Sequence, residues 1–282
     1  MGKIIWLASY PRSGSTWLRT LLTNYIKNKD TPISINQLLG GPLGSSRQCF
    51  NEWVGVNASS LTDSLILNLR PHVYRSISRH SKEILFIRVH DRWHRTDSGE
   101  ALFPEEITEG IVYIIRNPLA VAVSNKYFWN KDIEKSVEML CNDNFSLSQS
   151  KNKLSTLLEQ HLGSWGAHAQ SWVDRPKLPL LLIRYEDLFE NTEKTFGEVV
   201  KFCHLDYDLP RLQKAIRHSQ LSELQKQEKN FGFQEHYQKS LDFFFRKGKI
   251  NSWKDEIPKV LIHKLKEKNG EAMRRFEYPI DY

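Results

Sequence analysis

The sequence predicts an α/β fold of three layers, in which helices cover both faces of a central, mostly parallel sheet. Short runs of Ile, Val and Leu recur without polar alternation, which is typical of strands buried on both faces. A polar turn and a helical pattern follow each run, so strand and helix alternate as in βαβ units. The predicted strands are residues 4–8, 84–89, 111–115 and 180–183.

Helical patterns lie between and after these strands. We predict helices over residues 16–27, 119–129, 154–173, 190–203 and 210–218. Two polar stretches, 31–57 and 142–153, have no clear period and are interpreted as loops or short irregular helix. Because no repeat or linker is evident, we predict a single domain over residues 1–282, with variable loops near 31–57, 91–103 and 143–153.

The composition fits a folded protein that binds an anion or has a charged surface. The chain has 282 residues, of which 40% are hydrophobic, and 40 Lys and Arg against 33 Asp and Glu give a net charge of +7. This basic excess fits a solvated surface as well as a nucleotide or nucleic-acid ligand. Three separated cysteines without a C-x-x-C motif argue against disulfides and zinc. No apolar stretch resembles a signal or a membrane span, so we expect a soluble, cytoplasmic protein.

The segment 10–17, Tyr-Pro-Arg-Ser-Gly-Ser-Thr-Trp, connects the first strand to the first helix. Peptide N–H groups at a helix start, three hydroxyls and the charge of Arg12 would form a cradle for an anion. An ordinary helix cap after a turn is the alternative. The chain has no G-x-x-x-x-G-K-[ST] motif, which disfavours a standard P-loop NTPase.

This segment resembles the 5′-phosphosulfate loop of the sulfotransferases that use 3′-phosphoadenosine-5′-phosphosulfate (PAPS). The usual form of that loop is Y-P-K-S/A-G-T/N-T-W, and Arg12 stands here in place of its lysine. The resemblance implies a P-loop-like α/β fold and bacterial-type sulfation of a small molecule. It also implies that PAPS is the co-substrate and 3′-phosphoadenosine-5′-phosphate (PAP) the product. It assigns a first set of nucleotide contacts: Arg12, Ser13, Gly14, Ser15, Thr16 and Trp17.

A second segment, 111–124, combines a strand, a turn and a helix. It places Arg116 at the carboxyl end of a parallel strand, where open α/β sheets bind ligands. The string resembles the R-[ND]-P-x-[DE]-x-x-x-S element of the same family. The resemblance implies that Arg116 and Ser124 hold the 3′-phosphate of PAPS, although Ala120 replaces the family's acidic residue.

Two further segments extend the resemblance. Residues 245–254 are similar to the family's R-K-G-x-x-G-x-W-K segment, which assigns Arg246, Lys247 and Gly248 to the 3′-phosphate. Asn251 replaces a glycine there. Residues 183–188 resemble R-Y-E-D-L, which makes Tyr185 the candidate for contact with adenine. A weaker match adds Ser219 and Leu221 to the adenine site.

The general base is assigned to one of ten histidines. His90 ends the strand 84–90, where the family has K-T-H and uses the histidine as base. Arg88 stands in place of that lysine, so the catalytic set is His90, Arg12 and Arg88. We interpret Asp91 as a solvated residue, and His168, which shares a helical face with two tryptophans, as structural. No metal is expected, because cations and N–H dipoles already neutralise the leaving group.

Three alternatives stay open at this point. One is a nucleotide kinase, another is a non-catalytic nucleotide or nucleic-acid binder, and the third is a degenerate sulfotransferase with Arg at positions 12 and 88. The expected acceptor is a small molecule, a secondary metabolite, with no membrane or nucleic-acid partner. The aromatic candidates for its pocket are Phe50, Trp53, Trp93, Phe128 and Trp129. A homodimer stays open, since the dimer signature of the animal enzymes is absent after Trp253.

Overall fold

The computed structural model describes residues 2–41, 43–149, 155–174, 177–236, 243–251 and 253–280. The chain divides into two compact units, each built from three separate segments. The first unit comprises Met1–Tyr10, Gly40–Tyr113 and Asp143–Leu182. The second comprises Pro11–Leu39, Ile114–Asn142 and Ile183–Tyr282. That one domain spans residues 1–282 stays a prediction.

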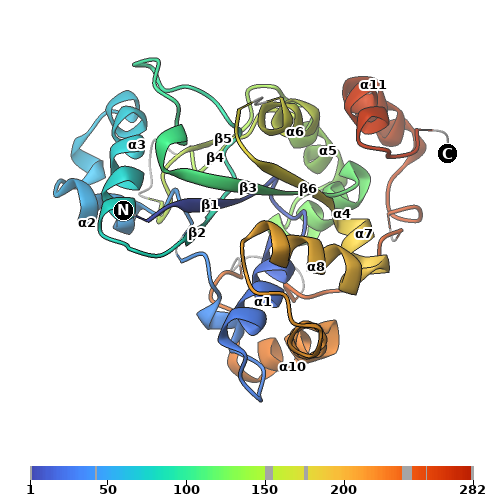
Figure 1. Ribbon diagram of the computed structural model, residues 1–282. Helices are drawn as coiled ribbons and strands as arrows, with labels where there is room; N and C mark the ends of the chain where they lie inside the picture. The colour runs from blue at the N-terminus through green and yellow to red at the C-terminus, as the bar shows by residue number, and fades with distance from the viewer. Residues whose placement is uncertain are drawn as a thin grey trace. The chain divides into compact units, whose positions relative to one another are not determined.

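The central sheet has four strands in the order β2-β1-β3-β6 (Figure 1). They are β1 (Ile4–Ser9), β2 (Leu85–Val89), β3 (Thr108–Ile115) and β6 (Leu180–Arg184). All six residues of β1 are buried, and β1 pairs in parallel with β2 from Ile4↔Leu85 to Ala8↔Val89. The α/β fold with a central parallel sheet and all four predicted strands are confirmed.

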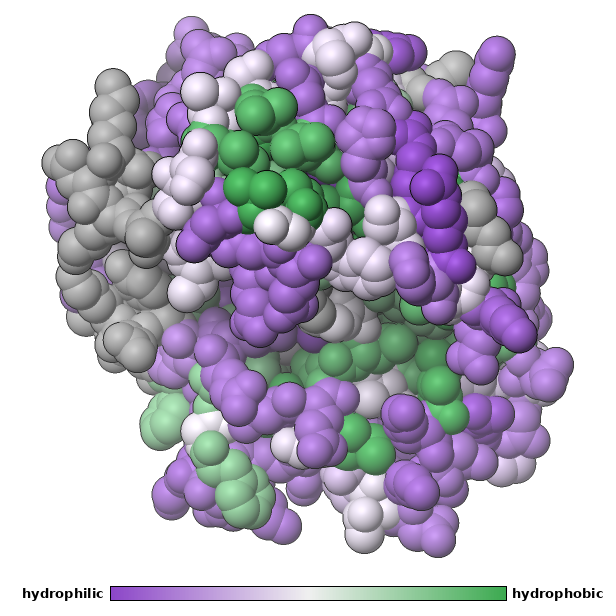
Figure 2. All heavy atoms as spheres, turned by 90° about the vertical axis from the view of Figure 1, so that its left-hand side faces the viewer, coloured by the Kyte–Doolittle hydropathy of each residue, from purple (hydrophilic) through white to green (hydrophobic). Residues whose placement is uncertain are grey.

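The first unit adds helices and a two-stranded sheet to β1 and β2. These elements are α2 (Arg47–Val54), η2 (Ala58–Ser60), α3 (Asp63–Arg79), η3 (Glu105–Ile107), β4 (Ser146–Leu147), β5 (Gln160–His161) and α6 (Trp165–Val173). Phe50 of α2 packs with Ile66 and Val73 of α3 in an apolar cluster. Figure 2 shows apolar side chains gathered on the face that carries α2 and α3. Val56, which follows α2, and Leu65 of α3 are 47% and 44% exposed.

The predicted helix over residues 154–173 is wrong in its first half. Residue 154 lies outside the described residues, and residues 160–161 form β5, which pairs antiparallel with β4. Gly163 then turns the chain with a φ of 70°, and the Ser164 hydroxyl accepts a hydrogen bond from the Ala167 N–H at 3.4 Å. A left-handed glycine followed by a serine cap marks a helix start, so α6 begins only at Trp165.

The second unit consists mainly of helices, together with the last two residues of β3 and β6. Its elements are α1 (Ser15–Lys27), η1 (Ile35–Gln37), α4 (Pro118–Trp129), α5 (Ile133–Cys141), α7 (Tyr185–Glu190), α8 (Thr192–Phe202), α9 (Leu209–His218), α10 (Leu221–Phe231) and α11 (Lys259–Arg275). The predicted helices 16–27, 119–129 and 210–218 are confirmed. The predicted helix 190–203 corresponds to α8, which is separated from α7 at Asn191.

Asp91 is buried, so its interpretation as a solvated residue is wrong. Its side chain is 1% exposed and accepts two hydrogen bonds from the Arg70 guanidinium, at 2.8 and 2.6 Å. Its backbone oxygen accepts a hydrogen bond from Trp172 at 3.1 Å. A buried carboxylate requires a charged or hydrogen-bonding partner. Arg70 lies in α3, far from Asp91 in the sequence, so no local pattern indicates this pair.

In the described part of the chain, no helix combines the length and the apolar character needed to cross a bilayer.

Candidate active site

The segment after β1 forms a loop with alternating backbone conformation. Arg12 and Gly14, on either side of Ser13, have positive φ values of 70° and 104°. Gly14 is also the N-cap of α1, and no side chain caps that helix terminus. The first turn of α1 has no acidic residue to balance the partial positive charge of the helix start. Such a loop at an uncapped helix N-terminus is suited to bind a phosphate.

The loop contains a buried hydroxyl that suits an anionic ligand, and it makes a close contact with Tyr185. The Ser13 side chain is fully buried, and its hydroxyl has no hydrogen-bond partner among the residues that the structure describes. A buried hydroxyl without a partner costs free energy unless a ligand or water satisfies it. In addition, a Cβ at Gly14 would overlap Cδ2 of Tyr185 and lie 3.0 Å from its Cε2. The loop is therefore packed directly against the tyrosine predicted to contact adenine.

We expect Gly14→Ala to destabilise the second unit and to abolish PAP binding. The substitution places an alanine at a φ of 104° and drives its methyl group into the Tyr185 ring. Overpacking and left-handed strain together predict a loss of about 2–4 kcal/mol in the free energy of unfolding. Denaturant unfolding and calorimetric titration with PAP measure the two effects.

Gly55→Ala is the matched control for that variant. Gly55 has a φ of 75° at the end of α2, but a Cβ there meets no atom within 4 Å. Gly55→Ala should lower the free energy of unfolding only by its backbone strain, about 1–2 kcal/mol, and leave PAP binding intact. Equal destabilisation by both substitutions would contradict a tight contact between Gly14 and Tyr185.

Arg12 is held in place by three groups of the second unit. Its Nε donates a hydrogen bond to the Ser124 hydroxyl at 3.0 Å, which joins two predicted site residues from α4 and the loop. Its Cζ lies 4.3 Å from the centre of the Phe128 ring and 4.2 Å from that of Phe244. Burial, with the nearby charge of Arg116, lowers the pKa of Arg12 to about 9. A bound anion would offset this crowding of cations.

Arg116 and Tyr185 are also brought together. The Arg116 guanidinium lies over the Tyr185 ring, with its Cζ 4.3 Å from the centroid, and donates a hydrogen bond to the Arg12 carbonyl at 3.2 Å. The Trp17 ring meets Tyr185 edge-on at 5.7 Å between centroids. The Trp17 Nε1 donates to the Ser219 carbonyl at 3.0 Å. Segments following β1, β3, β6 and α9 thus converge within the second unit.

The segment 246–248 joins the same assembly. A Cβ on Gly248, which has a φ of 56°, would lie 2.6 Å from Cδ2 of Leu221. Arg246 stacks on Tyr127, with its Cζ 3.8 Å from the ring centroid. The Lys247 Nζ lies 3.1 Å from Oε1 of Glu256. The assignment of Arg246 and Lys247 to the 3′-phosphate stays a prediction, and their partners Tyr127 and Glu256 were not anticipated from the sequence.

Three residues of this site were missed by sequence reasoning. Phe244 stacks on Arg12, while Gln225 and Glu228 of α10 bind the backbone of residues 244–246. None belongs to a recognised motif, and a glutamate in a polar helix carries no local signal of burial. Of the aromatic candidates for the acceptor pocket, Phe128 lies against Arg12 and Phe50 packs in the α2–α3 core.

His90 lies in the first unit, directly after β2. Its Nδ1 is 2.9 Å from the carbonyl oxygen of Ser9 and 3.2 Å from the Ser9 hydroxyl. A carbonyl only accepts, so Nδ1 carries the proton and Nε2 of a neutral His90 keeps its lone pair. That tautomer can accept a proton at Nε2. Ser9 ends β1, three positions before Arg12 in the chain.

His168 holds the backbone of His90 and is structural, as predicted. The His168 side chain is fully buried, its Nε2 donates to the His90 carbonyl at 2.9 Å, and its Nδ1 accepts from Tyr113 at 2.8 Å. Burial lowers the pKa of His168 to about 4, so the ring is neutral near pH 7. The backbone of Arg88 is fixed as well, since its carbonyl accepts from the Gly44 N–H at 2.8 Å.

The residues that the structure describes contain no group of three or more His, Cys, Asp or Glu side chains that could hold a metal ion.

Comparisons with known proteins show the family of this chain. The profile of the sulfotransferase domain matches residues 3–277, so the chain belongs to the sulfotransferase family. Sulfotransferase 2A6 of Rattus norvegicus is 25% identical over 262 residues, which cover 89% of this chain and 78% of the relative. Sulfotransferase 1B1 of Canis lupus familiaris is 23% identical over 263 residues, covering 88% and 76%.

Solved structures share the fold. Mouse sulfotransferase SULT7A1 complexed with PAP matches with a TM-score of 0.61 and 19% identity, covering 96% of this chain and 85% of that one. Retinol dehydratase in complex with androsterone and inactive cofactor PAP matches with a TM-score of 0.60 and 17% identity, covering 99% and 82%. These likenesses extend over nearly the whole chain and support the P-loop-like α/β fold.

Proposed function

We propose that this sulfotransferase moves a sulfuryl group from PAPS to a hydroxyl, N-hydroxyl or amine of a small secondary metabolite and releases PAP. The observation that carries the proposal is the convergence of Arg12, Ser124, Arg116 and Tyr185 in the second unit. These residues come from three motifs far apart in the chain. The two solved relatives named above hold PAP, and one of them also holds androsterone.

The cradle residues fit the chemistry of the nucleotide. The unpartnered Ser13 hydroxyl and the uncapped start of α1 would bind the 5′-phosphate, with Arg12 as the adjacent cation. Arg116, Ser124 and the segment 246–248 would hold the 3′-phosphate. Tyr185, Trp17, Ser219 and Leu221 would surround the adenine. When bound, PAPS supplies the sulfuryl group that the acceptor receives.

The remaining roles concern proton transfer and charge. We assign the general base to His90, whose Nε2 would take the proton of the acceptor as its oxygen or nitrogen forms the new bond to sulfur. Arg12 and the α1 N–H groups would stabilise the negative charge that develops on the leaving 5′-phosphate. We assign Arg88 a supporting charge near the sulfuryl group. No step needs a metal under this assignment.

A transfer assay with [35S]PAPS tests the reaction. Purified protein is incubated with pools of phenols, alcohols, hydroxamates and amines, and labelled products are separated by chromatography. We expect label to enter at least one acceptor class and added PAP to suppress that transfer. PAP binding without transfer to any class would favour the non-catalytic nucleotide binder. Transfer of phosphate from [γ-32P]ATP would favour the kinase.

A further inference from the structure

The cation at position 12 is an arginine with aromatic rings on two sides. Phe128 comes from α4, whereas Phe244 comes from a segment without regular secondary structure. Besides its ring contact, the Phe244 carbonyl accepts a hydrogen bond from the Arg12 guanidinium at 3.4 Å. The Phe128 and Phe244 rings are 5.8 Å apart between centroids and meet at 84°, so they form two walls of a corner that holds the Arg12 guanidinium, and a shift of Phe244 would open one wall. The orientation of Arg12 therefore depends on what fixes residues 244–246.

Helix α10 fixes this segment with two side chains that lie one turn apart. Glu228 is 4% exposed, and its two carboxylate oxygens accept hydrogen bonds from the Phe244 N–H at 2.7 Å and the Phe245 N–H at 3.0 Å. Gln225 donates to the carbonyls of Phe245 at 2.9 Å and Arg246 at 2.7 Å. Two N–H groups and two carbonyls of an irregular segment are thus satisfied by one helix.

We propose that Glu228 is a positioning residue of the nucleotide site, and this inference rests on the proposed function. Its carboxylate, assisted by Gln225, fixes residues 244–246 so that the Phe244 ring holds the Arg12 guanidinium in orientation. Arg246 of the same segment is placed by the same hydrogen bonds. The preorganised cations then meet the phosphates of the nucleotide without a cost for ordering the segment.

The chemistry of this position requires a carboxylate. Each oxygen of Glu228 accepts from a different backbone N–H. A glutamine in its place would have one acceptor oxygen, and its NH2 group would face the second N–H donor. The charge also matters, because the Glu228 carboxylate interacts favourably with Arg12 among the cations Arg116 and Arg246. His236 is a further neighbour, with its Nδ1 3.5 Å from Oε1.

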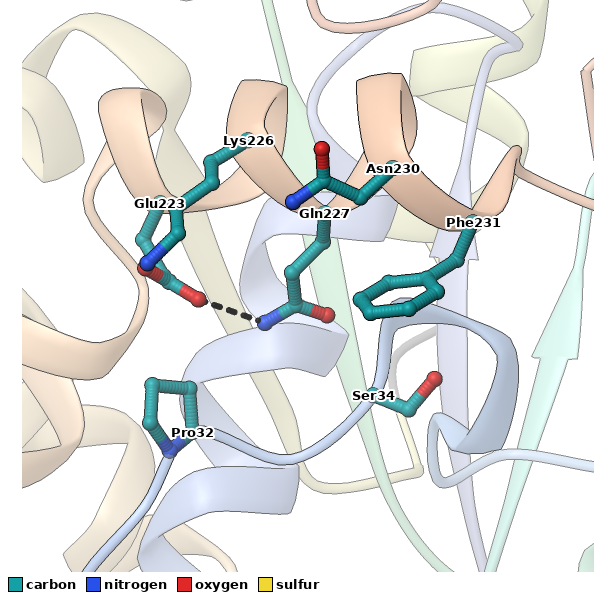
Figure 3. A pocket seen from close by; sticks show the side chains of 7 residues that line it. All are labelled: Pro32, Ser34, Glu223, Lys226, Gln227, Asn230 and Phe231. Atoms are coloured by element: carbon teal, nitrogen blue, oxygen red, sulfur yellow. Dashed lines mark hydrogen bonds between the residues drawn. The ribbon is translucent and has the colours of Figure 1, made fainter.

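The opposite edge of α10 offers a matched control. Figure 3 shows Glu223 of this helix beside Gln227. Both line a pocket of about 450 Å3, together with Pro32 and Ser34. Gln227 donates to Glu223 at 3.0 Å and accepts from the Ile35 N–H at 2.9 Å. Glu223→Gln keeps an acceptor for Gln227 and leaves residues 244–246 untouched. It removes the same charge from the same helix.

The first readout needs no nucleotide. In protein labelled with 15N-arginine, the Arg12 Nε–H donates to Ser124 and belongs to a guanidinium whose Cζ lies over two aromatic rings, so we expect ring currents to shift its proton resonance upfield. Arg12→Lys assigns the signal by removing it. Glu228→Gln should remove the upfield shift, as should Phe244→Leu, whereas Phe244→Tyr and Glu223→Gln should keep it. Retention of the shift in Glu228→Gln would overturn the proposal.

The second readout is PAP affinity, measured by calorimetry. Glu228→Gln and Phe244→Leu should each weaken binding by about tenfold or more, the loss expected for one misplaced charged contact. The double variant should bind PAP at most about twofold more weakly than the single variant of lower affinity, because both substitutions act through one ring. Fully additive losses would overturn the proposal. Gln225→Ala, a milder change, carries the same test if Glu228→Gln does not fold.

The two readouts separate the positioning proposal from the proposed function. If the wild-type chain does not bind PAP but Glu228→Gln still removes the Arg12 shift, the proposed function fails and the anchoring of residues 244–246 stands. If PAP binds and neither readout changes in Glu228→Gln, the proposed function stands and the role of Glu228 is wrong.

Discussion

Replacing His90 by alanine should reduce the rate of sulfuryl transfer by about 10²–10⁴-fold, the usual contribution of a general base. The hydrogen bond from Nδ1 to Ser9 fixes the tautomer in which Nε2 accepts a proton. Alanine removes that acceptor and leaves every residue of the nucleotide cradle unchanged. Steady-state kinetics with [35S]PAPS and an acceptor found in the transfer assay measure the effect on kcat.

PAP affinity is the control for the His90→Ala variant. The cradle residues lie in the second unit and His90 in the first, so calorimetric titration should give a dissociation constant within about threefold of the wild type. His72→Ala, at an exposed histidine of α3, should change neither quantity. A His90→Ala protein that transfers sulfate at the wild-type rate, or that no longer binds PAP, would contradict the assignment of His90 as base.

Replacing Asp91 by asparagine should cost about 3–5 kcal/mol in the free energy of unfolding, the range measured when one member of a buried ion pair is removed. Arg70 is 2% exposed in its side chain and would keep its charge without a carboxylate. Asp91 also accepts from the His161 N–H at 3.2 Å, so the substitution loosens β5 as well. Denaturant unfolding followed by circular dichroism measures the loss.

Two comparisons test the origin of that loss. Arg70→Met combined with Asp91→Asn should be less destabilised than Asp91→Asn alone, because no buried charge is left unpaired. Glu138→Gln breaks an exposed pair with Lys264, 3.7 Å apart, and should stay within about 0.5 kcal/mol of the wild type. Equal losses in the buried and exposed variants would contradict the account.

The same pair predicts how stability depends on pH. Burial by itself raises the pKa of Asp91, but the charge and hydrogen bonds of Arg70 outweigh it and hold the pKa below its ordinary value. Its contribution is fully present above the pKa of the unfolded chain, about 3.9, and is lost as pH falls through the lower folded value. The wild type should therefore lose more stability below pH 4 than Asp91→Asn does.

The sequence predicted the strands well because their signal is local. Runs such as residues 4–8 and 111–115 are apolar throughout, and a strand buried on both faces needs nothing else. The part of the predicted helix over residues 155–164 had helical residue types, but the β4–β5 pairing and Gly163 overrode them. Pairing between distant segments leaves no periodic trace, so this error could not be avoided from one sequence.

The residues of the candidate site were named from three motifs. Arg12, Tyr185 and the pair Arg116 and Ser124 come from separate strings, and the structure brings the four residues together. Their roles in binding a nucleotide stay predictions. The supporting residues were missed because their roles arise from tertiary contacts. Buried Glu228 accepts from the N–H groups of Phe244 and Phe245, and buried Asp91 is paired with Arg70 of α3.

Calorimetric titration of the purified chain with PAP, 5′-AMP and ATP, without added metal, tests the central claim most directly. The claim is that the second unit holds a site for a nucleotide with both 3′- and 5′-phosphates. We predict micromolar binding of PAP, binding of 5′-AMP at least about 100-fold weaker because two or more charged contacts are lost, and no response to ATP. Equal affinity for PAP and 5′-AMP, or preference for ATP, would contradict the claim.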